Sequence, residues 1–364
     1  MGAELIPARA TPPGRIIRRE LDARGWTQKN LAEITGRPEQ TISQIVRGRK
    51  QITPKTALQL AAAFGTSPDF WLNLETNYQV HQARKRLDQS EIARKSRLYS
   101  LTPVAELIKR GWIQASDSLD DLEREVCDFL GIANLEDQPC LAVNFRQSQT
   151  YDPEVAAEVA WVKRVERLVR AQTVATYDHG QLCAALPTLL TYSAVPEGAG
   201  QVPTVLHNLG VHFVIVPHLP HTYLDGAAFT FEEHPVVALT LRYDRIDSFW
   251  FTLLHELAHI VAGHEGLYLD NLDERDGNDV ETEANQLAQD WLIDRTAFTK
   301  FVAATQPYFS RAKIIAFAQS MGRHPGIVLG RLHYEGLIPY KNLRTLLLSV
   351  KPQLENWIDA PGPM

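Results

Sequence analysis

The sequence predicts a mainly helical chain with an α+β module at its C-terminal end. Two observations support this: short helical patterns separated by Gly and Pro fill the first 78 residues, and apolar runs typical of strands appear only after residue 210. At roughly 150 residues per domain, 364 residues favour two or three units. We expect a five-helix domain at residues 1–78, a helical connector or scaffold at residues 79–172, and a module with a small sheet at residues 173–364.

Capping residues delimit the five N-terminal helices. We expect helices from Arg15 to Arg24, from the N-cap Thr27 to Gly36, from Pro38 to Gly48, from Lys55 to Phe64 and from Asp69 to Leu74. The connector is mostly helical by pattern and ends in a long amphipathic segment, Pro153 to Gln172. Beyond it, the pattern predicts strands at residues 211–217, 227–231 and 236–241, then helices at residues 248–263 and 280–293.

Composition and charge narrow the class of protein. The chain is 45% hydrophobic and 22% charged, which is typical of a globular protein. Its apolar runs are shorter than the roughly 18 residues of a membrane span, and its start lacks a signal sequence, so we expect a cytoplasmic protein. Residues 1–86 hold 14 Lys and Arg against 7 Asp and Glu, a net of +7, whereas the rest holds 23 against 36, a net of -13. A basic head on an acidic body favours a polyanion as partner of the head.

The second and third helices, joined at Gly36-Arg37, predict a helix-turn-helix. Ile42, Ile45 and Val46 would face inward and leave polar residues of the third helix outside. Gln can bind adenine and Arg can bind guanine, each with two hydrogen bonds. Candidate base contacts are Gln40, Thr41, Ser43, Gln44 and Arg47, and candidate phosphate contacts are Gln28, Arg49 and Lys50. The alternative is a solvated helix face without a ligand.

Residues Arg15 to Asn77 resemble the HigA-type antitoxins of the XRE class of helix-turn-helix repressors. The resemblance lies in Trp26-Thr27-Gln28 and in the segments 36–43 and 66–74. It implies a homodimer that binds a palindromic operator in double-stranded DNA, often the protein's own promoter, and therefore a location at the nucleoid.

An H-E-x-x-H sequence, His255-Glu256-Leu257-Ala258-His259, lies on the helix predicted at residues 248–263. Residues four apart lie about 40° apart around a helix axis, so His255 and His259 point the same way and can share one metal ion. Zinc accepts such imidazole ligands and, in catalytic sites, keeps one position open for water. Glu256 is adjacent to that face and can act on this water as general base. We therefore predict Zn²⁺ as cofactor and Glu256 as the catalytic residue.

The third protein ligand must come from elsewhere, and the next predicted helix offers Glu281 and Glu283. Ala284 and Ala288 mark the buried face of that helix. At about 100° per residue, Glu281 lies roughly 50° from the centre of this face and Glu283 roughly 110° from it. We expect Glu281 to be the ligand, with Glu283 as the open alternative, and Asn285 to hydrogen-bond a ligand histidine. A carboxylate favoured only by the helix dipole is the other explanation for Glu281.

From about Ala142 to Pro339 the chain resembles the ImmA/IrrE family of zinc-dependent metallopeptidases. The resemblance lies in the 255–259 motif, in Glu281-x-x-Ala284-Asn285-x-x-Ala288, and in runs at residues 218–228, 235–244 and 324–332. It implies a zincin-like fold of the gluzincin type, with an edge strand at Val236 to Arg242 that pairs with an extended substrate. Known members cut repressors that carry helix-turn-helix domains. Leu287 replaces the usual Phe and should only alter packing.

Two functions fit such a fusion. In the first, the head binds operator DNA and the body is a zinc endopeptidase that cleaves a regulator or toxin partner, or the fusion itself, in a stress or toxin-antitoxin response. In the second, a catalytically idle antitoxin or repressor uses the protease fold as a scaffold that binds a toxin. The intact set of candidate ligands favours the enzyme, because ionisable groups are costly to bury without a metal.

Overall fold

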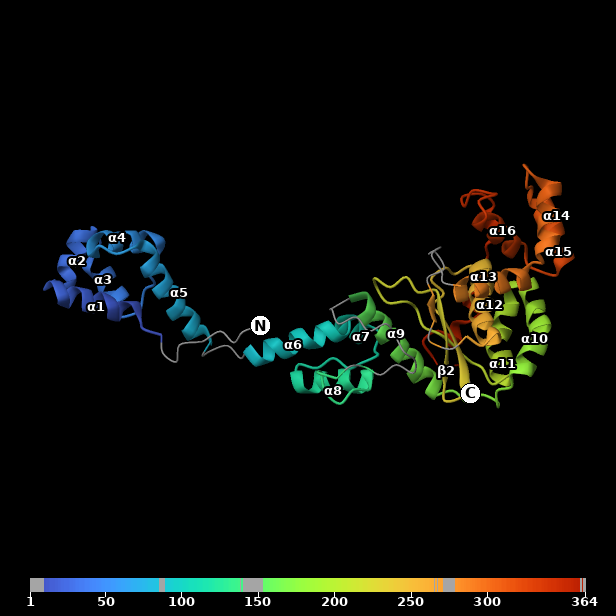
Figure 1. Cartoon of the computed structure of the whole chain (residues 1–364), viewed down its shortest axis with the longest axis horizontal. Coiled ribbons are helices and arrows are strands. Elements are labelled where there is room, and N and C mark those ends of the chain that lie inside the picture. The colour runs from blue at the N-terminus through green and yellow to red at the C-terminus, as the bar shows by residue number, and fades with distance from the viewer. Residues whose placement is uncertain are drawn as a thin grey trace. The chain divides into compact units, whose positions relative to one another are not determined.

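The computed structural model describes residues 10–84, 89–137, 139, 153–264, 266, 268–270, 279–360 and 362. The chain divides into two compact units, residues 1–95 and 96–364, and Figure 1 labels helices of each unit and strand β2 of the second. No helix in these described ranges is long and apolar enough to cross a bilayer.

The first unit is a bundle of short helices around one apolar core. Its helices are α1 (Pro13–Arg24), α2 (Gln28–Thr35), α3 (Glu39–Val46), α4 (Pro54–Phe64) and α5 (Pro68–Arg84). Thr27 caps α2 in a capping box with Asn30, and Gly36 ends it in the left-handed conformation at φ 64°. Helix α5 continues ten residues past the predicted end at Leu74, because no Gly or Pro interrupts residues 75–84.

The second unit combines a sheet with helices on both of its faces. Its helices are α6 (Gln89–Leu101), which starts in the first unit, α7 (Val104–Lys109), α8 (Leu119–Leu130), α9 (Pro153–Arg170), α10 (His179–Thr191), α11 (Val202–Asn208), α12 (Ile246–Ala262), α13 (Asp279–Leu292), α14 (Arg295–Thr305), α15 (Arg311–Met321) and α16 (Pro325–Tyr334). Its strands are β1 (His212–Ile215), β2 (Gly226–Phe231), β3 (His234–Leu239) and β4 (Tyr268–Asp270).

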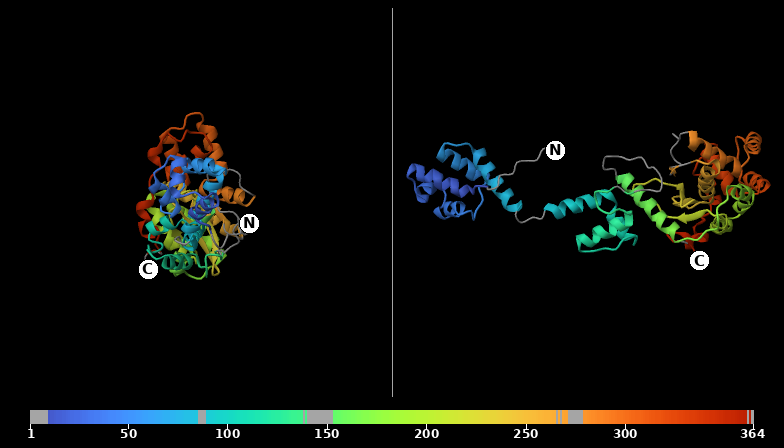
Figure 2. Two further views of the ribbon diagram at one scale, coloured as in Figure 1. Left: turned by 90° about the vertical axis from the view of Figure 1, so that its left-hand side faces the viewer. Right: turned by 60° about the horizontal axis from the view of Figure 1, so that its bottom comes forward.

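Alternate residues of a strand point to opposite faces of the sheet and here pack into two separate hydrophobic cores. In β1, Phe213 and Ile215 join the core formed with α10, α11 and α12, while Val214 joins the core formed with α8 and α9. The sheet therefore lies between these two groups of helices, as the views in Figures 1 and 2 show. The fold is mostly helical, with one small mixed sheet in the C-terminal part, as the sequence predicts.

The segment expected as a connector, residues 79–172, does not form a body of its own. From residue 96 onward it belongs to the second unit. Trp161 of α9 is fully buried, and its indole N–H donates to the carbonyl oxygen of Val216 at 2.7 Å. The apolar face of α9 thus covers the sheet, which explains why the sequence of α9 is amphipathic.

The strand expected at the sheet edge, Val236 to Arg242, is an inner strand. The strand order is β1-β3-β2-β4, so β3 pairs in parallel with β1 and antiparallel with β2. Its backbone groups are used on both sides and cannot accept a substrate. The outer side of β1 pairs with Ile358 near the C-terminus, through a bridge at Ile215. Strand β4 forms the other edge of the described sheet and pairs antiparallel with β2.

Candidate metal centre and DNA interface

Helix α12 carries the H-E-x-x-H residues into the core of the second unit. The helix is apolar for most of its length and contacts β2, β3 and α13. His255 and Glu256 are 0% exposed and His259 is 1% exposed. Three ionisable side chains are therefore buried on one helix, and burial of this kind requires compensating partners or a metal ion.

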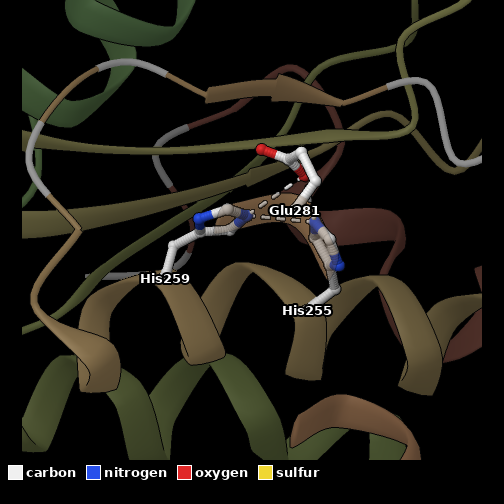
Figure 3. A group of neighbouring side chains, drawn as sticks. All are labelled: His255, His259 and Glu281. Atoms are coloured by element: carbon white, nitrogen blue, oxygen red, sulfur yellow. Dashed lines mark hydrogen bonds and ion pairs between the residues drawn. The ribbon is translucent and has the colours of Figure 1, made fainter. Parts of the chain in front are cut away.

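Glu281 of α13 meets the two histidines. Its Oε2 atom lies 3.2 Å from His255 Nε2 and 3.5 Å from His259 Nε2, and the two Nε2 atoms are 3.1 Å apart. Figure 3 shows both imidazoles pointing from α12 toward this carboxylate. The structure thus brings together the three ligands that the sequence predicts. His255 and His259 lie one turn apart on α12, and Glu281 lies at the start of α13.

The chemistry of this donor set fits zinc. Two imidazole nitrogens and one carboxylate oxygen lie within 4.8 Å of one another, which is the ligand set of zinc hydrolases with an H-E-x-x-H helix. The Glu281 side chain is 21% exposed, whereas the histidines are buried. Solvent therefore reaches the cluster on its carboxylate side.

Glu256 lies against the first residue of β2. A Cβ atom added at Gly226 would collide with Glu256 Oε1 and come within 2.9 Å of Glu256 Cδ. The strand can approach the carboxylate this closely only because residue 226 has no side chain. Sequence reasoning missed Gly226, since a glycine at the start of a strand carries no chemical signal of its own.

The structure separates Glu283 from the triad, and it gives the burial of Asn285. Glu283 is 60% exposed, and its Oε2 lies 3.5 Å from Nε2 of His264 rather than beside the ligand pair. Asn285 is half-buried one turn after Glu281, and its hydrogen bond to a ligand histidine stays a prediction. His264 was not singled out in the sequence, although it follows Gly263, the residue that ends α12.

A cavity of about 300 Å³ lies between α12, α13 and α16. Phe251 lines it, and the Phe251 ring lies 6.3 Å from the His255 ring, so the cavity is about one helical turn from the triad. Its wall also contains Asp247, whose carboxylate pairs with Arg245 at 3.1 Å. Burial raises the pKa of Asp247, against the opposing charge of Arg245. The remaining wall combines apolar and aromatic residues with the charged residues Asp225 and Arg331; the apolar and aromatic ones include Leu292, Ile293, Ile327, Tyr334 and Tyr340.

The helix-turn-helix residues lie as the predicted periodicity requires. Ile42, Ile45 and Val46 of α3 are buried in the core of the first unit. Gln40, Arg47, Arg49 and Lys50 are exposed, and Gln28, Thr41, Ser43 and Gln44 are half-buried. One face of α3 thus presents amide, hydroxyl and guanidinium groups next to basic residues at its C-terminal end, an arrangement that can bind a DNA groove.

Two family models match this chain. The model described as "Helix-turn-helix" matches residues 17–71. The model described as "IrrE N-terminal-like domain", of peptidase type M78, matches residues 209–319, which include the whole candidate metal centre.

Curated relatives align with about a fifth of the chain. The uncharacterized HTH-type transcriptional regulator YddM of Escherichia coli K12 is 32% identical over 82 residues, which are 22% of this chain and 87% of that regulator. Antitoxin HigA-1 of Vibrio cholerae is 35% identical over 77 residues, 21% of this chain and 72% of the antitoxin. Among solved structures, Pseudomonas aeruginosa antitoxin HigA with the higBA promoter is 32% identical and covers 21% of this chain and 86% of its own, with a TM-score of 0.21.

Proposed function

We propose that this chain, which belongs to the helix-turn-helix transcriptional regulators and carries an IrrE N-terminal-like domain, is a DNA-binding regulator with a zinc-dependent endopeptidase. The observation that carries the enzymatic half is the cluster of the buried His255 and His259 with the partly exposed Glu281, together with the buried Glu256 that follows His255 on α12. The target is a protein: a repressor or a toxin partner, or this chain itself.

The residues of the cluster divide two tasks in peptide hydrolysis, metal binding and proton transfer. His255, His259 and Glu281 would hold the zinc ion, which when bound supplies Lewis-acid activation of the scissile carbonyl and of water. Glu256 takes a proton from the attacking water on a carboxylate oxygen and passes it to the leaving amine. Gly226 leaves the space that this carboxylate occupies. Burial of Glu256 excludes bulk water that would compete for the same proton.

The surroundings of the cluster suggest how a peptide would lie. Strand β4 is an edge of the sheet that the described residues form, and its Asp270 is opposite Gly226, the residue that faces Glu256. An extended substrate that adds to the outer side of β4 would extend the sheet whose next strand, β2, contacts Glu256 through Gly226. The cavity one helical turn from the triad would then receive a side chain of the substrate, and its wall, which combines apolar and aromatic with charged side chains, favours a large one.

In the first unit, α3 would enter the major groove of an operator as one half of a homodimer. Gln40, Gln44 and Arg47 would contact base edges, with Thr41 and Ser43 beside them. Gln28, Arg49 and Lys50 would bind phosphates. Binding to chromosomal DNA would keep the protein in the cytoplasm, at the nucleoid.

The test compares cells that express the full chain with cells that express Glu256→Gln. The change keeps the ligand set, so it separates catalysis from metal binding. Sequencing of protein N-termini should reveal new termini only with the unchanged chain, and the same cleavage should be reproduced with purified components.

Identical sets of N-termini in the two strains would refute the endopeptidase. Protection from a toxin encoded beside this chain's gene should also be measured. If Glu256→Gln protects cells to the same degree as the unchanged chain, the catalytically idle antitoxin scaffold would be the better description. DNA binding is tested separately, by footprinting on the promoter of the chain's own gene.

A further inference from the structure

The end of α12 places a third histidine against a candidate ligand. The backbone N–H of His264 donates to the carbonyl oxygen of His259 at 3.0 Å, and that of Gly263 donates to Ile260 at 3.2 Å. Together with φ 72° at Gly263, these two bonds form a Schellman motif. In this motif the residue after the glycine folds back over the last helical turn, so His264 is held beside His259.

The usual contact at this position is apolar, and here it is a hydrogen bond. Nδ1 of His259 lies 3.1 Å from Nδ1 of His264, with the two ring centroids 5.1 Å apart. The His264 side chain is 11% exposed. An apolar residue would end the helix equally well, so helix termination does not account for a polar, largely buried ring.

The proton positions along this contact follow from the ligand geometry. His259 faces His255 and Glu281 with Nε2, so Nε2 must offer its lone pair to a metal and the ring proton must lie on Nδ1. That N–H then donates to Nδ1 of His264, whose own proton must lie on Nε2. The Nε2 atom of His264 is in turn 3.5 Å from Oε2 of Glu283.

We propose that His264 and Glu283 are positioning residues that hold His259 in the orientation and tautomer needed to bind zinc. The inference rests on the zinc site of the proposed function and assigns new roles to two residues outside the donor set. Partners of this kind, which orient a metal-binding imidazole through its second nitrogen, commonly change metal affinity by about 10- to 100-fold when removed.

The experiment measures the zinc affinity of the full-length chain by competition with a chromophoric chelator. His264→Ala should bind zinc about 10- to 100-fold more weakly than the unchanged chain. His264→Asn should recover most of the affinity, because its Oδ1 atom lies near the position of the lost Nδ1 and accepts the same hydrogen bond. Glu283→Ala should give a smaller loss, since it acts one step further away and is largely exposed.

Two matched controls separate this role from general effects. His179 also contacts the end of α12, but through the backbone oxygen of Val261 at 3.1 Å, so His179→Ala should leave zinc affinity unchanged. Asp290 is an exposed acid on the same helix as Glu283, so Asp290→Ala removes an equal charge without touching His264. The Co²⁺-substituted protein provides a spectroscopic readout, because a reoriented His259 should change its visible absorption bands in His264→Ala and not in the controls.

The outcomes are distinct. If the unchanged chain binds one zinc and His264→Ala binds it equally tightly, the positioning role is refuted and the proposed function stands. If His264→Asn fails to recover affinity and both variants melt lower without metal, His264 serves packing alone and the proposal is again wrong. An unchanged chain that binds no zinc would overturn the proposed function and this inference with it.

Discussion

Removal of Glu281 should empty the metal centre, whereas removal of Glu283 should not. Glu281 Oε2 lies within 3.5 Å of both imidazole Nε2 atoms, while Glu283 reaches only His264. Glu281→Ala would leave two histidines, which do not complete a catalytic zinc site. Glu283→Ala keeps all three donors and is expected to retain one zinc per chain, bound more weakly.

The size of the effect follows from linkage between binding and folding. A metal ion present at about 1,000 times its dissociation constant stabilises the folded state by roughly 4 kcal/mol, since the unfolded chain does not hold the site together. For a large unit such as residues 96–364, each kcal/mol shifts the thermal midpoint by about 2 °C. Glu281→Ala should therefore lose about 8 °C of zinc-dependent stabilisation, while its midpoint without metal stays close to that of the unchanged chain.

The assay measures zinc content after dialysis and the thermal midpoint with and without added zinc, for the unchanged chain and both variants purified in parallel. A zinc-dependent rise in midpoint should appear in the unchanged chain and in Glu283→Ala only. A metal-free Glu283→Ala beside a fully loaded Glu281→Ala would refute the reasoning, because it would mean that the ligand face of α13 has been assigned to the wrong side.

Three further predictions test other parts of the molecule. Gly226→Ala should abolish cleavage as fully as loss of Glu256 while zinc content stays at one per chain, because the new Cβ displaces that carboxylate; normal cleavage would contradict the geometry. Burial lowers the pKa of His212 to about 4. As the pH falls, this histidine is therefore protonated at a higher pH in the unfolded chain than in the folded one. The free energy of unfolding should fall by up to about 3 kcal/mol between pH 7 and pH 4. Urea titrations of His212→Phe should show a flatter dependence, and an equally steep one would exclude this histidine as the cause. In footprinting, Arg47→Ala should reduce discrimination between operator and random DNA by about 1–3 kcal/mol, whereas Lys50→Ala should weaken binding to both; the reverse pattern would exchange their roles.

The elements that sequence reasoning located well are those set by local interactions. Helix α2 begins at its predicted cap Thr27, and α12 ends at its predicted glycine, Gly263. The apolar spacing of α13 predicted which side of this helix is buried. The structure agrees, because Ala284 and Ala288 are buried and Glu281 faces His255 of α12. Caps and periodicity depend on residues a few positions apart, so one sequence contains all the information they need.

The order of the strands could not be obtained in this way. An inner and an outer strand of a sheet covered on both faces are equally apolar, so Val236 to Leu239 carries no mark of its position. Its place between β1 and β2 depends on pairing with strands that lie elsewhere in the chain, and β1 is itself covered by Ile358, more than 100 residues later. Strand β4, which forms the edge of the sheet within the described part of the chain, has three residues and lies in a region whose sequence predicts a loop.

The same non-local contacts bear on the choice between an enzyme and an idle scaffold. A binding scaffold needs the surface of the fold but has no use for a carboxylate that is 0% exposed in an apolar helix. Glu256 is a fully buried carboxylate, and the strand opposite must lack a side chain at Gly226 to admit it. A fold that served only as a scaffold would not require a carboxylate at position 256. The buried carboxylate and the glycine that admits it occur together, which favours the proposed enzyme over the scaffold. Comparison of the unfolding free energies of the unchanged chain and Glu256→Leu without metal would measure how the carboxylate changes the stability of the fold.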